Sequence, residues 1–174
     1  MNDLEKYNEV RSEIKTGDII SWRSNHLVGQ LIRVFSSGKV NHVSTVTKMD
    51  CLDLDRILIT EALGSGLQPQ RLSDRLSKHK GKAWWHHLKD KYNPIRGNIE
   101  KWLIERWWTP YGFGELFDFM DGKVKANSKR MICSESAFLA AKFAGVEEMQ
   151  NTIYSPSPET LTWFFCYEKG IEIL

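Results

Sequence analysis

Residues 133–145 read CSESAFLAAKFAG and carry the clearest helical pattern in the second half of the chain. Small side chains allow this segment to pack closely against a neighbour; they are Ser134, Ser136, Ala137, Ala140 and Ala141. Gly145 follows the last apolar residue, where glycine commonly ends a helix. The stretch therefore predicts a helix from Cys133 to about Ala144.

Two β-rich segments precede this helix, His42–Thr47 and Ile57–Ala62. The polar stretch 48–56 separates them, so we expect the two segments to pair as antiparallel strands. A third strand is predicted at Ile19–Trp22, directly after the turn-like Thr16-Gly17-Asp18. The expected fold class is α+β, with an antiparallel sheet curled toward a small barrel and the Cys133 helix packed against it.

Weaker patterns predict further elements. Helices are expected at 2–14, 26–36, 72–76, 95–108, 115–120 and 159–163, and strands at 83–88 and 171–174. The chain has 174 residues, 41% of them hydrophobic and 26% charged, which excludes a disordered or fibrous protein. No repeat or linker interrupts it, so residues 1–174 are predicted to form a single domain.

The sequence also predicts where the protein works. Its apolar runs are far shorter than the roughly 20 residues that span a bilayer, so we expect no transmembrane segment. Charges interleave the first 15 residues, which lack the apolar centre of a secretory signal. We expect a cytoplasmic protein, with a phage or prophage origin as the other setting. The three cysteines, at 51, 133 and 166, form no CxxC pair, which predicts free thiols and no metal site.

A basic, tryptophan-rich segment covers residues 71–108. It holds ten Lys or Arg against four acids and five of the seven tryptophans, although the whole chain has a net charge of only +2. A binding module could use such a segment to hold a glycan, a lipid surface or a nucleic acid. The simpler interpretation places Trp102 and Trp107 on the apolar stripe of a helix, as core residues. Nucleic acid is therefore not the expected partner.

Cys133 stands where a polar segment gives way to the predicted helix. Unsatisfied N–H groups and the helix dipole favour a thiolate at that position, and Lys129 and Arg130 act in the same direction. A small buried residue that helps the helix to pack is an equally good interpretation from position alone. Cys51 and Cys166 lack the helix-start context and are expected to be structural.

A nucleophilic cysteine needs a base and a group that orients the base. His42 opens a predicted strand, and Glu61 follows the apolar run of the next one. Burying Glu61 without a partner would be costly, and His42 across the strand pair would supply one. The alternatives are a half-buried structural histidine and a solvated glutamate at a strand end.

The order of these pieces resembles the permuted NlpC/P60 group of papain-like enzymes, and above all its YiiX and YaeF type. The pieces are Thr16–Ile20, Asn41–Ser44, Thr60–Ala62 and Cys133–Glu135, with Thr109–Gly112 before the helix and Ser155–Pro158 after it. In that group the catalytic cysteine follows the histidine in the chain. The resemblance therefore implies a permuted papain-like fold over about residues 16–164.

Carried over to this sequence, the resemblance makes Cys133 the nucleophile, His42 the base and Glu61 the residue that orients the imidazole. Tyr111 becomes an oxyanion or substrate contact, although Gly112 stands where the family often has aspartate. Asp18 and Glu135 are expected to be structural residues near the site.

The activity implied is that of a cysteine peptidase or amidase that cleaves peptides of the peptidoglycan type through an acyl-enzyme. Lipid acyl esters or amides are the second substrate class, hydrolysed or used in acyl transfer. We expect a small peptide or acyl substrate and no metal or organic cofactor. A non-catalytic binding module that uses the segment 71–108 is the remaining alternative.

Overall fold

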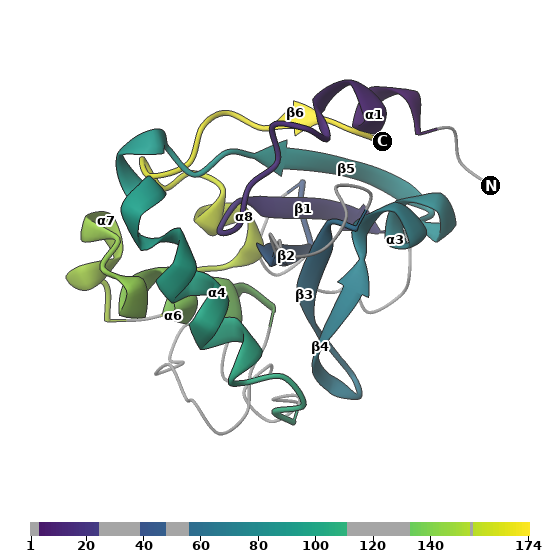
Figure 1. The fold of residues 1–174 in the computed structure, drawn as a ribbon. Helices are drawn as coiled ribbons and strands as arrows, with labels where there is room; N and C mark the ends of the chain where they lie inside the picture. Colours follow the sequence, from purple (N-terminus) through teal and green to yellow (C-terminus); the bar gives the residue numbers. More distant parts are fainter. Residues whose placement is uncertain (1–3, 25–38, 48–55, 111–132, 154) are drawn as a thin grey trace.

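The computed structural model describes residues 4–24, 39–47, 56–110, 133–153 and 155–174. Their centre is a six-stranded antiparallel sheet with the order β4-β3-β2-β1-β5-β6. The strands are β1 (Ile19–Ser24), β2 (His42–Thr47), β3 (Leu58–Leu63), β4 (Gly66–Arg71), β5 (Gly81–His86) and β6 (Ile171–Glu172). In Figure 1, β1 and β5 run across the direction of β3 and β4, so the sheet is strongly curled. Within the described residues it stays open, with β4 and β6 as its edges.

Helices cover both faces of the sheet. They are α1 (Glu5–Val10), α3 (Leu72–Lys78), the 3₁₀ helix η1 (Asp90–Ile95), α4 (Arg96–Ile104), α6 (Cys133–Ala144), α7 (Glu147–Gln150) and α8 (Pro158–Leu161). Side chains alternate between the faces along each strand. On β1, Ile19 belongs to the core cluster that includes residues of α4 and α6, whereas Ile20 and Trp22 belong to the cluster that includes residues of α1 and α3.

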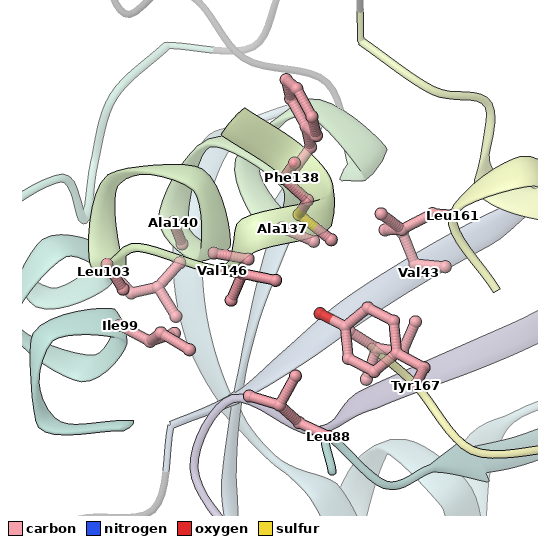
Figure 2. Packing of buried hydrophobic residues seen from close by; sticks show 14 of the residues in the cluster. Val43, Leu88, Ile99, Leu103, Ala137, Phe138, Ala140, Val146, Leu161 and Tyr167 are labelled. Carbon is pink, nitrogen blue, oxygen red and sulfur yellow. The ribbon is translucent and has the colours of Figure 1, made fainter. Parts of the chain in front are cut away.

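Helix α6 packs between the sheet and α4. Figure 2 shows part of this core, with Ile99 and Leu103 of α4 beside Ala140 of α6. Ala140 and Phe138 are fully buried, so small and large side chains of α6 both face the interior. Gly145 ends the helix with φ +102°, a conformation that glycine adopts without the cost that other residues incur.

Several sequence predictions are confirmed. The bounds of β2 and α6 agree with the predicted segments, and β2 pairs antiparallel with β3. The structure corrects others: β4 and α7 were not predicted, and α4 ends at Ile104 rather than at residue 108. The predicted helices at 26–36 and 115–120 lie outside the described residues. No helix in the described ranges is both long and apolar enough to cross a membrane.

The basic, tryptophan-rich segment is spread over the fold. Trp85 is buried in the core on the side of α1 and α3, and Trp102 in the core on the side of α4 and α6. Trp107 lies beyond the end of α4 and is half-buried, with its Nε1–H 3.0 Å from Thr60 Oγ1, and Trp108 is exposed. The core prediction is confirmed for Trp102, and the five tryptophans do not form one aromatic platform.

Candidate active site

The first residue of α6 meets the first residues of β2. The pairing of β2 with β3 covers Thr45–Thr47 and Leu58–Thr60, so it does not extend to His42 at the start of β2. Cys133 lies beside His42 and Val43, and the residue is 6% exposed. Its sulfur forms a hydrogen bond with the His42 imidazole and accepts from the backbone N–H groups of Val43 and Ser134.

Glu61 lies on the other side of the same imidazole. His42 Nε2 donates to Glu61 Oε1 over 3.1 Å, which leaves Nδ1 as the ring nitrogen for Cys133. Because Thr45 pairs with Thr60, Ser44 comes opposite Glu61, and the Ser44 hydroxyl donates to Glu61 Oε1 over 2.7 Å. Glu61 is fully buried, so the interpretation of a solvated glutamate at a strand end is wrong.

The electrostatics of these groups favour an ion pair. Burial alone raises the pKa of the Cys133 thiol, but the charge and hydrogen bond of His42 outweigh it and lower that pKa overall. Burial lowers the pKa of His42, whereas Cys133 and Glu61 together raise it from 6.5 to about 10. The arrangement therefore favours a thiolate beside an imidazolium.

A carboxylate as deeply buried as Glu61 needs compensation, and Arg75 of α3 supplies a charge. Arg75 Nε lies 3.1 Å from Glu61 Oε2 and 3.4 Å from Oε1. Burial raises the pKa of Glu61, but His42, Arg75 and Ser44 lower it to about 2. Trp22 completes the surroundings, because its Nε1–H donates to Ser44 Oγ over 2.6 Å. No sequence pattern indicated Arg75 or Trp22, since both act through packing between distant segments.

Three other residues were predicted to lie at or near the site: Asp18, Glu135 and Tyr111. Asp18 is fully buried just before β1 and accepts from Trp85 Nε1–H over 2.7 Å and from Arg96 Nη1–H over 2.8 Å. Glu135 is fully buried in the first turn of α6. Tyr111 and the oxyanion contact expected from it lie outside the described residues.

The second described cysteine provides a contrast. Cys166 is free and fully buried, and burial raises the pKa of its thiol to about 12. Cys133 is also free and buried but has the opposite shift, because a histidine contacts it. The structural interpretation of Cys166 agrees with these surroundings, and Cys51 lies outside the described residues.

The chain is similar in fold to proteins of known structure. No protein-family model matches the chain, and no curated protein matches it. A crystal structure from Escherichia coli O157:H7, described as metalloprotein yiiX of DUF1105, is similar over 90% of this chain and 96% of its own, with a TM-score of 0.66 and 13% identity. The chain thus has a YiiX-like α+β fold. At 13% identity this similarity concerns the fold and not the function. Among the residues described here, no three His, Cys, Asp or Glu side chains cluster as metal ligands would.

Proposed function

We propose that the protein is a cysteine hydrolase with a permuted papain-like fold of the NlpC/P60 type. Cys133 is the nucleophile, His42 the general base and acid, and Glu61 the residue that orients the imidazole. The observation that carries the proposal is the continuous chain of contacts from the Cys133 sulfur through the His42 ring to Glu61 Oε1. A packing cysteine would need neither partner, and Cys166 has no such pair among the described residues.

The proposed reaction begins with the thiolate of Cys133 attacking the carbonyl carbon of an amide. The tetrahedral intermediate collapses as the His42 imidazolium gives its proton to the leaving amine, which leaves an acyl group on sulfur and a neutral imidazole. Water then attacks the thioester while His42 takes one of its protons. The acid is released, and the thiolate and imidazolium are restored.

The position of Cys133 supports this chemistry in a second way. Its sulfur is at the first residue of a twelve-residue helix, where N–H groups without helical partners stabilise negative charge. The backbone N–H of Cys133 is the donor that we propose for the oxyanion of the intermediate.

Short peptides of the peptidoglycan type are the substrates we propose. This choice rests on the motif order that the chain shares with the permuted NlpC/P60 group, in which the histidine precedes the cysteine. Acyl esters and amides of lipids are the competing class. A test of activity therefore needs both kinds of substrate.

Mass spectrometry of the intact protein tests the proposal. The protein would be mixed with peptidoglycan-derived peptides, with lipid esters and with the activated ester p-nitrophenyl acetate, and each sample quenched in acid. We expect an acyl adduct on Cys133 that is absent from Cys133→Ala and unchanged in Cys166→Ser. Turnover that survives in Cys133→Ala would refute the proposal, and turnover of lipid esters alone would correct the substrate class.

A further inference from the structure

Glu61 contacts a half-buried cationic side chain, Arg75, in addition to the imidazole that it orients. Beyond His42 and Ser44, its oxygens contact the Arg75 guanidinium, and Arg75 is itself held in place. Arg75 Nη1 donates to His79 Nδ1 over 3.3 Å, and His79 Nε2 donates to the Arg23 carbonyl over 3.1 Å.

Two aromatic contacts fix the same assembly. The guanidinium carbon of Arg75 lies 4.7 Å from the centre of the Trp22 ring, a cation–π contact. The rings of Trp22 and His79 meet edge to face with centroids 5.0 Å apart. Arg75 is therefore held by Trp22, His79 and Glu61, and its side chain is 24% exposed.

The formal charges show what this arrangement does in each stage of the reaction. In the free enzyme, the thiolate and Glu61 carry two negative charges, and the imidazolium and Arg75 two positive ones. In the acyl-enzyme the sulfur is neutral and His42 must be neutral to accept a proton from water. Glu61 and Arg75 then balance each other.

Without Arg75, a neutral His42 would leave a buried carboxylate with no compensating charge, which is costly. A proton would instead stay on the His42–Glu61 pair, and His42 could not act as a base. We propose that Arg75 is a positioning residue for hydrolysis of the acyl-enzyme, which it promotes by holding Glu61 ionised and in place while His42 is neutral. This inference rests on the proposed cysteine hydrolase activity.

The titratable groups that face this pair come from three described elements. Glu61 faces His42 of β2 and Arg75 and His79 of the α3 segment, and His42 also faces Cys133 of α6. His79 has a pKa lowered by burial and by Arg75, so it is neutral near pH 7 and its Nδ1 can accept from Arg75. Arg75 is thus the permanent positive charge beside Glu61.

The test is the pH dependence of deacylation. The protein would be pulsed with p-nitrophenyl acetate, freed of reagent, and the loss of the acetyl group from Cys133 followed by intact mass at several pH values. In Arg75→Met we expect the midpoint of this profile to move up by about one pH unit or more, so that deacylation below the midpoint is about tenfold slower. Arg75→Lys keeps the charge and should restore most of the rate.

A merely structural role would not give this pattern. In a Glu61→Gln background, Arg75→Met should shift the midpoint no further, because its effect passes through the carboxylate. Equal midpoints in Arg75→Met and wild type, or an equal shift in Arg75→Lys, would overturn the inference. So would a full shift in the Glu61→Gln background.

The same experiment separates this inference from the proposed function. If the wild type forms no acetyl-enzyme on Cys133, the hydrolase proposal itself fails. Labelling of Cys166 reports unfolding, because that thiol is fully buried in the native protein. If Arg75→Met exposes Cys166, Arg75→Gln, which also lacks the charge but can still donate to Glu61, is measured in its place with the same expected shift.

Discussion

Replacing Asp18 with asparagine should destabilise the fold strongly. Asp18 is fully buried, and its carboxylate receives four close donors, the backbone N–H groups of Lys15 and Leu88, at 2.9 and 3.0 Å, and the side chains of Trp85 and Arg96, at 2.7 and 2.8 Å. These donors tie the segment before β1 to the end of β5 and to α4. An asparagine side chain would keep the shape, but its NH₂ group would face donors.

The magnitude follows from the pair with Arg96. Arg96 is 8% exposed, and breaking a buried ion pair by neutralising one partner costs about 3–5 kcal/mol. Arg96 also donates to the carbonyls of Thr16 and Leu88, and these hydrogen bonds would still partly stabilise its positive charge in the variant. We therefore expect the lower end, about 3 kcal/mol, or a fall in Tm of roughly 6–12 °C for a domain of this size.

Urea unfolding at pH 7, followed by circular dichroism, measures this free energy directly. Asp90→Asn is the matched control, because the Asp90 side chain is 68% exposed and its ion pair with Lys15 lies at the surface. Its unfolding curve should overlay that of the wild type. A loss of less than about 1 kcal/mol in Asp18→Asn would refute the view that this buried carboxylate organises the fold.

Burial, titration and backbone conformation give three further predictions. Phe138→Ala should lower the unfolding free energy by about 3–5 kcal/mol in urea titrations, whereas Phe143→Ala on the same helix, at a position 72% exposed, should have little effect. The pKa of Glu61 is about 2 in the folded protein against an ordinary 4.5, so the unfolded chain takes up a proton at a higher pH than the folded protein does. The free energy of unfolding should therefore fall as pH drops from about 4.5 to 2, and Glu61→Gln should flatten that dependence in acid titrations. Gly145→Ala should lower the free energy of unfolding by about 1–2 kcal/mol, measured by thermal unfolding, because φ at this residue is +102°. A Cβ there would meet no atom within 4 Å, so the backbone conformation alone accounts for the expected loss, and an unchanged Tm would contradict it.

The sequence predicted those parts of the fold in which local pattern and tertiary packing agree. The β-rich run His42–Thr47 and the small-residue pattern from Cys133 to Ala144 gave the bounds of β2 and α6. Strand β4 was not predicted because Gly66–Arg71 is polar and contains Pro69, which disfavours a strand on propensity. An edge position tolerates such a strand, and β4 is an edge of the sheet.

The candidate site was predictable in its residues and less so in its environment. The order of His42, Glu61 and Cys133 along the chain singled out the three side chains that the structure brings together. The surroundings that hold Glu61 were not predictable, because Arg75 reaches it from α3 and Trp22 reaches Ser44 from β1. Such contacts depend on how the elements pack, which no local pattern specifies.

The alkylation rate of Cys133 against pH, measured in the wild type and in His42→Ala, tests whether Cys133 and His42 form a reactive thiolate–imidazolium pair. Iodoacetamide labelling read by peptide mass spectrometry would follow Cys133 and Cys166 in the same sample. We expect Cys133 to react fast below pH 7 and to lose this advantage in His42→Ala, while Cys166 stays unlabelled in both. If Cys133 titrates near about 8.5 like an ordinary thiol, with or without His42, the two residues do not form such a pair.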